Sequence, residues 1–160
     1  MTATTDLLAL HLAWNLEIAQ MTLADMTDAE LIQRPAPTAN HALWQLGHVT
    51  VSEAQELSTL IPGVTACPES FAARFTKETQ GLNEISNFPS KDEILAELTR
   101  VRAAVIAGVK QLSDEQLVQP SPVPWAKNVG QLVLALSEHL TMHLGQLQVL
   151  RRKLGKPVLF

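Results

Sequence analysis

The chain has 160 residues, of which 46% are apolar and 18% are charged, so it is globular rather than disordered. This length allows a sizeable hydrophobic core, and we predict a single domain over residues 1–160. The formal net charge is −4, and the basic run Arg151-Arg152-Lys153 suits the last turn of a helix. These features argue against nucleic acid as a partner.

The sequence also argues against a membrane protein. No apolar run approaches membrane-spanning length, and no positively charged segment precedes the first apolar residues. Cys67 is the single cysteine, which excludes an intramolecular disulfide and fits a reducing compartment. We therefore predict a soluble, cytoplasmic protein without a membrane partner.

Four long segments carry apolar residues at the spacing of an amphipathic helix, with start and stop signals at their ends. Thr5 precedes the first, Asn40 the second, and Ser90-Lys91-Asp92-Glu93 forms a capping box at the third. Gly155 and Pro157 end the fourth. The predicted helices span residues 6–26, 41–60, 91–112 and 127–154. This pattern predicts an all-α fold, a four-helix bundle.

A long connection, residues 61–89, separates the second and third predicted helices. Residues 68–79 within it favour a short helix with Phe71 and Phe75 packed inward, while the remainder has too little periodicity to assign. A connection of this length permits helices that follow each other in sequence to lie apart in space. The helix order and the role of the connection stay open from sequence.

Three histidines fall on apolar helix faces. His139 and His143 are one helical turn apart on the last helix, which is a spacing at which two imidazoles can hold one metal ion. His48 lies in the apolar stripe of the second helix, beside Gly47. A close contact or ligand access would explain this glycine, and the alternative is that it is simply tolerated in the helix. Three imidazoles match the ligand number of a catalytic zinc site. The residues alone leave a metal site and ordinary core histidines both open.

A general base is harder to name from the sequence. Glu138 adjoins His139 but points about 100° away around the helix, toward a neighbour or solvent. Glu53 follows His48 by five residues and is a weak candidate. No catalytic residue is therefore assigned.

Other polar residues are weighed as supporting groups. Gln146 and Asn15 are candidates to hold an imidazole in one tautomer, although each also fits an ordinary helix polar residue. His11 is expected to cap or pack, and His41 to be solvated in the first turn of its helix. Cys67 lies in an irregular segment and is expected to be a bystander rather than a nucleophile.

Two blocks resemble a known family. Leu43–Val49 contains the pattern W-x-L-x-H, and Glu138–Leu147 contains H-x-x-x-H-x-G-Q. The end of the last predicted helix, Leu150–Gly155, follows the second block and also matches. Both blocks are similar to those of the DinB-like superfamily. The resemblance implies a four-helix bundle with a divalent metal ion, zinc or nickel, held by three histidines. Carried over to this chain, the metal ligands are His48, His139 and His143.

The resemblance also implies a choice of functions. Relatives include transferases and isomerases that use a low-molecular-weight thiol, as well as metal-dependent hydrolases, and family members often form homodimers. We therefore expect a metal-dependent S-transferase or hydrolase that uses metal-bound thiolate or hydroxide on a small-molecule substrate. The alternative is a non-catalytic, metal-stabilised structural or regulatory bundle. A bis-histidine haem protein is disfavoured, because the third histidine would have no role.

Overall fold

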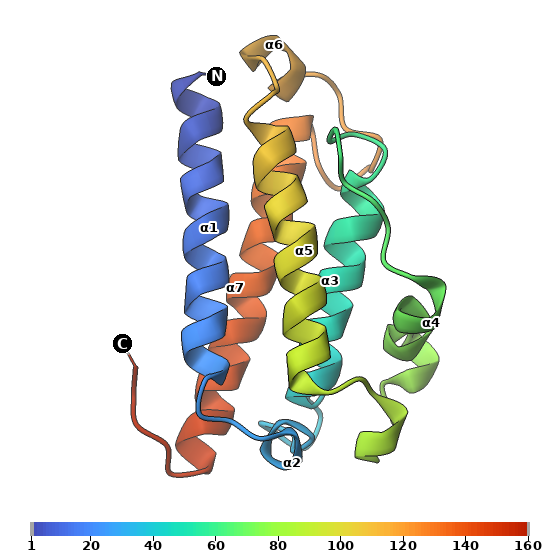
Figure 1. The fold of residues 1–160 in the computed structure, drawn as a ribbon, viewed down its shortest axis with the longest axis vertical. Helices are drawn as coiled ribbons and strands as arrows, with labels where there is room; N and C mark the ends of the chain where they lie inside the picture. The colour runs from blue at the N-terminus through green and yellow to red at the C-terminus, as the bar shows by residue number, and fades with distance from the viewer. Residues whose placement is uncertain (1, 160) are drawn as a thin grey trace.

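The computed structural model describes residues 2–159. Four long helices dominate it and run along one common axis (Figure 1): α1 (Ala3–Leu23), α3 (Ala42–Leu57), α5 (Lys91–Val109) and α7 (Val129–Lys153). The described residues form no strand, so the predicted all-α class is confirmed. Within residues 2–159, every helix falls short of the length or apolarity that a bilayer crossing requires.

The long helices do not pack in their chain order. Helix α1 packs against α5 and α7, and α3 packs against the same two helices. Helices α1 and α3 therefore occupy opposite corners of the bundle, on the left and right of Figure 1. The long connection after α3 provides the chain length for this arrangement.

Local capping differs from the sequence prediction at two helices. Helix α1 begins at Ala3 behind Thr2, whose hydroxyl accepts from the Thr5 backbone N–H, so Thr5 is not the cap. Helix α3 begins at Ala42 behind His41 instead of Asn40, because the His41 Nδ1 accepts the Trp44 N–H at 3.1 Å. The side chain of His41 is buried against the Phe88 ring, so the expectation that it is solvated was wrong.

The remaining ends follow the predicted signals more closely. The capping box of Ser90 is present, and α5 begins at Lys91. Further capping boxes at Thr27 and Ser113 start the short helices α2 (Asp28–Leu31) and α6 (Asp114–Leu117). Gly155, with a φ of 70°, follows α7 in the left-handed region that suits a helix C-terminus.

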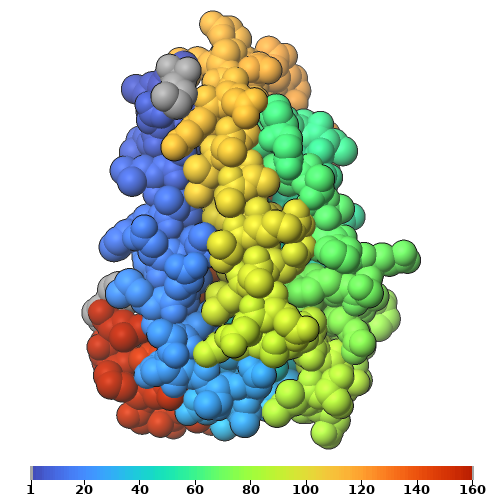
Figure 2. All heavy atoms as spheres, viewed as in Figure 1, coloured from blue at the N-terminus to red at the C-terminus, as the bar shows by residue number. Residues whose placement is uncertain are grey.

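The connection after α3 forms short helical pieces that cover one face of α3. These are α4 (Glu69–Ala72), η1 (Ala73–Phe75), η2 (Lys77–Thr79) and η3 (Ile85–Asn87). The predicted helix over 68–79 is interrupted at Thr76, which has an extended backbone. This segment forms the right-hand edge of the face shown in Figure 2. Phe75 packs on Gly47 so closely that an added Cβ would lie 2.1 Å from the ring, which explains the glycine.

A buried polar layer divides the hydrophobic core into two apolar clusters. Each long helix contributes one residue to this layer: Asn15, Glu53, Arg102 and Ser137. The Arg102 guanidinium donates to the Glu53 carboxylate at 2.6 Å and to the Ser137 hydroxyl at 3.3 Å. The Asn15 amide donates to the same hydroxyl at 2.8 Å. All four helices are therefore joined by hydrogen bonds at one level of the bundle.

Candidate metal centre

The three histidines singled out in the sequence meet between α3 and α7. One ring nitrogen from each of His48, His139 and His143 lies within 4.8 Å of the other two. The His139 and His143 Nε2 atoms are 3.1 Å apart. Two nitrogens on one tetrahedral zinc ion are separated by about 3.3 Å, given Zn–N bonds of about 2.0–2.1 Å. The spacing of this pair therefore fits two ligands on one ion.

A hydrogen bond across the helices orients His143. Its Nδ1 lies 2.8 Å from the Oε1 of Gln45, and the Gln45 amide nitrogen donates to the Asn40 carbonyl. Because that second bond fixes which end of the amide is oxygen, the Nδ1–H of His143 is the donor to Gln45. The lone pair of His143 then lies on Nε2, the atom that faces His139.

His48 is held by stacking, and its ring makes no hydrogen bond to another of residues 2–159. Its ring lies on the Trp44 indole, with centroids 4.7 Å apart and planes 15° from parallel. The indole N–H donates to the Thr79 hydroxyl at 3.0 Å, so the segment that follows α4 fixes the indole. The W-x-L-x-H pattern thus brings a tryptophan and a histidine one turn apart onto the same face of α3.

The three imidazoles are neutral near neutral pH. Burial lowers the pKa of His143 from 6.5 to about 4, and repulsion from charge on His139 and His48 adds to this effect. Burial also lowers the pKa of His48, with a further contribution from His139, and lowers the pKa of His139. Neutral imidazole is the form that binds metal ions. A set of neutral nitrogen donors suits zinc or nickel.

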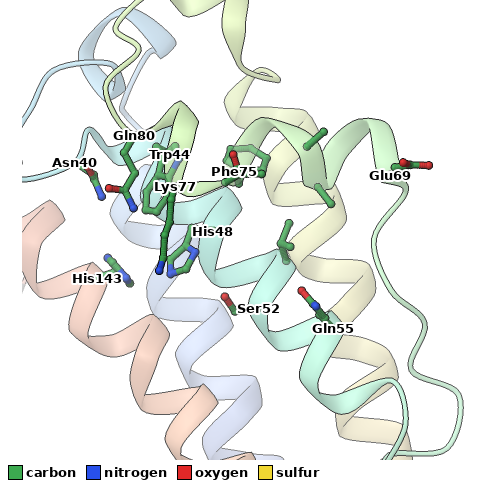
Figure 3. A pocket seen from close by; sticks show the side chains of 14 residues that line it. Asn40, Trp44, His48, Ser52, Gln55, Glu69, Phe75, Lys77, Gln80 and His143 are labelled. Atoms are coloured by element: carbon green, nitrogen blue, oxygen red, sulfur yellow. The ribbon is translucent and has the colours of Figure 1, made fainter.

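Two cavities border the histidines, and His48 and Ser52 line both. The first, here the Lys77 cavity, has a volume of about 720 Å³ and also reaches His143. Figure 3 shows Trp44 and Gln80 above His48 in this cavity, and the Lys77 side chain extending down beside the His48 ring. The second, here the Trp125 cavity, has a volume of about 840 Å³ and also reaches His139. Ligands can therefore reach the centre through either cavity.

The structure does not support Glu53 as a general base. Its side chain is 1% exposed and pairs with Arg102, so it reaches neither cavity. Burial raises the pKa of Glu53, and the Arg102 guanidinium opposes this rise. Glu53 is therefore part of the core rather than of the site.

The supporting groups also differ from those weighed in the sequence. Asn15 donates to Ser137 of the polar layer, and its contact with an imidazole is with His11 at 3.4 Å. Among residues 2–159, the Gln146 side chain makes no hydrogen bond to an imidazole. Gln45 takes the supporting role instead. The sequence offered no signal for it, because its bond to His143 spans 98 positions.

Two further residues stand as expected. Glu138 is exposed and pairs with His11 at 2.9 Å, which agrees with its predicted direction toward a neighbour or solvent. Cys67 is half-buried and lines neither cavity, and burial raises the pKa of its thiol to about 12. A protonated thiol outside both cavities agrees with the expected bystander.

Sequence reasoning missed Glu56. It lies two turns after His48 and one turn after Ser52, and all three line the Trp125 cavity. The Oε2 atom of Glu56 is buried without a hydrogen-bond partner among the described residues. Burial raises the pKa of this carboxyl. The spacing from His48 was available in the sequence, but only the structure shows that the side chain borders a cavity.

The bundle and its three histidines define a class of protein, namely helical bundles that carry a candidate three-histidine metal centre. The sequence model of the DinB superfamily matches residues 11–147. The chain belongs to this superfamily, as its two sequence blocks predicted.

A solved structure similar to this one is described as the conserved protein of locus from Enterococcus faecalis. The two superpose with a TM-score of 0.69 over 98% of this chain and 99% of the other, at 22% identity. At that identity the likeness shows the shared fold alone. The search of curated proteins found no match.

Proposed function

We propose that the chain binds one divalent metal ion, zinc or nickel, through His48, His139 and His143, and uses it in an enzymatic reaction. The convergence of three ring nitrogens within 4.8 Å carries this proposal. When bound, the ion supplies Lewis acidity that lowers the pKa of a coordinated water or thiol. The chain supplies neutral imidazoles, and Gln45 keeps the lone pair of His143 on Nε2.

The two cavities favour a transferase over a hydrolase. A transferase must hold two organic molecules next to one centre, whereas a hydrolase needs one such molecule and water. His48 and Ser52 border both cavities, so two ligands, one in each cavity, can lie next to the same centre. The cosubstrate suggested by the family resemblance is a low-molecular-weight thiol. The homodimer and the cytoplasmic location stay predictions.

Metal analysis of the purified protein tests the proposal. We expect about one divalent ion per chain, and loss of most of it in His48→Ala, His139→Ala and His143→Ala. His11→Ala is the matched control, because His11 lies outside the triad and should leave the metal content unchanged. Gln45→Leu should lower metal affinity about 10–100-fold, because the tautomer of His143 is no longer held. Metal-free protein, or triad variants with wild-type metal content, would refute the site.

Turnover separates the enzyme from a metal-stabilised structural protein. The zinc-loaded chain is incubated with a small thiol and an alkylating electrophile, and separately with an activated ester. The proposal expects thioether formation above the rate of His139→Ala. If metal removal lowers the melting temperature while neither reaction is accelerated, the structural alternative holds instead.

A further inference from the structure

The Trp125 cavity combines an apolar wall with negative charge. Trp125, Leu134 and Met142 line it and are 50%, 43% and 58% exposed, so a ligand there would cover large apolar side chains. Glu56 and Glu138 are the acidic residues of the lining. Among the described residues, no lysine or arginine lines this cavity, in contrast to the Lys77 cavity. The charge of the wall therefore favours a cationic ligand.

Glu56 is the acidic residue of this wall that lacks a partner. Glu138 already has a partner, because its Oε1 atom lies 2.9 Å from the Nε2 atom of His11. The Oε2 atom of Glu56 is removed from water, and within residues 2–159 nothing donates a hydrogen bond to it. A buried carboxyl oxygen without a donor is costly, and rotation of the Glu56 side chain toward an N–H group of a ligand in the cavity would remove the cost. Burial also raises the pKa of Glu56, and a bound cation would favour its charged form.

The position of Glu56 makes it a contact for the far end of a ligand. His48, Ser52 and Glu56 follow each other at intervals of four on α3, so they lie along one face. Eight residues of α-helix span roughly 12 Å. Glu56 therefore stands about two helical turns from His48 along the wall of the cavity.

We propose that the Trp125 cavity binds a molecule with an apolar body and a primary ammonium group. The ammonium group donates to Glu56, and the body lies on Trp125 and Met142. An ammonium group is favoured over a neutral donor because charge-assisted hydrogen bonds are roughly twice as strong, and because a cation is also attracted to an indole face. The opposite end of the molecule points to the histidines, and this last assignment alone rests on the proposed function.

Three probes of equal chain length test the charge preference: hexylammonium, hexanol and hexanoate. Their affinities are measured by calorimetry at pH 7 and low ionic strength, first with metal-free protein, so that the amine has no metal ion to coordinate. Hexylammonium should bind at least about tenfold more tightly than the other two. The measurement is then repeated with the zinc-loaded protein, where the same preference is expected.

Variants assign the preference to the cavity. Glu56→Gln should abolish it with little change in shape, whereas Glu69→Gln, which removes a carboxyl from the Lys77 cavity, should leave it intact. Leu134→Lys places a cation on the exposed wall of the Trp125 cavity and should reverse the preference toward hexanoate. Circular dichroism checks that each variant folds, and Leu134→Lys provides the test if Glu56→Gln does not.

Several results would overturn the inference. These are equal affinity for the three probes, no binding of any probe at millimolar concentration, and an unchanged preference in Glu56→Gln or in Leu134→Lys. Metal content is measured on the same samples. A chain that takes up no zinc on loading but still prefers hexylammonium would refute the proposed function and support this inference, whereas a zinc-loaded chain without the preference would do the reverse.

Discussion

Removal of Arg102 should be among the most destabilising single changes in the bundle. Arg102 and Glu53 are 0% and 1% exposed, and the guanidinium donates to the carboxylate at 2.6 Å. Replacing Arg102 by leucine leaves a carboxylate in the core without its cation. Removing one partner of a buried ion pair costs about 3–5 kcal/mol, much more than the pair itself contributes. We expect Arg102→Leu to lose that amount of the free energy of unfolding.

The double variant Glu53→Leu/Arg102→Leu separates this cost from a general loss of packing. Replacing both members of a buried pair by apolar residues is often neutral or stabilising. The double variant should therefore be more stable than Arg102→Leu, and close to the wild type. It also leaves Ser137 with Asn15 as a hydrogen-bond partner, so the polar layer is only partly removed.

Urea unfolding followed by circular dichroism measures these differences. With an m-value of about 2 kcal/mol/M, a loss of about 4 kcal/mol lowers the midpoint by about 2 M. The control is Arg100→Leu, because Arg100 lies on the same helix but is 41% exposed and pairs with Glu97 at the surface. That pair should contribute less than about 1 kcal/mol. Equal losses in the single and double variants, or a loss in Arg102→Leu no larger than in Arg100→Leu, would refute the reasoning.

Two other predictions concern residues around the site. Burial, with a smaller effect of the Arg34 charge, lowers the pKa of His41 from 6.5 to about 4. Between these two pH values the unfolded chain therefore binds a proton that the folded chain does not bind. The contribution of neutral His41 to the free energy of unfolding is thus complete above pH 6.5, and it falls by up to roughly 3 kcal/mol as the pH is lowered toward 4. His41→Asn keeps a capping side chain and should show a shallower fall in pH-dependent urea unfolding; identical profiles would contradict this assignment. Gly47→Ala should lower the melting temperature, because its Cβ meets the Phe75 ring at 2.1 Å and overpacking of about 1–3 kcal/mol exceeds a helix gain of about 1 kcal/mol. Adding Phe75→Leu should restore stability, and a Gly47→Ala protein more stable than wild type would show that the ring moves freely.

The features that sequence predicted well are local ones. The capping box at Ser90 is complete within four residues, and it is present. The prediction that Asn40 caps α3 was wrong. It rested on the high intrinsic preference of asparagine for the N-cap position. Burial of the His41 ring against Phe88 overrides that preference, and no local pattern reports it.

The candidate site likewise contains residues that could be predicted from the sequence and residues that could not. The three histidines could be found because two share a helix turn and all three lie on apolar stripes. Gln45 and Glu56 could not be assigned, because one acts across 98 positions and the other is distinguished only by the cavity that it borders. Arg102 looks like an ordinary surface residue in sequence, and its burial depends on Glu53 from another helix.

Two of the four helices that form the polar layer, α3 and α7, also carry the histidine centre, and this explains why a charged pair in the core is useful. Glu53 follows His48 by five residues on α3, and Ser137 precedes His139 by two on α7. Apolar packing is non-directional, so by itself it tolerates small shifts of one helix along another. Hydrogen bonds have strict distances and angles, and Arg102 forms them to both Glu53 and Ser137. The layer thus sets the register of α3 against α7 within two turns of the three imidazoles, where a shift of an ångström would separate the nitrogens of the proposed metal site.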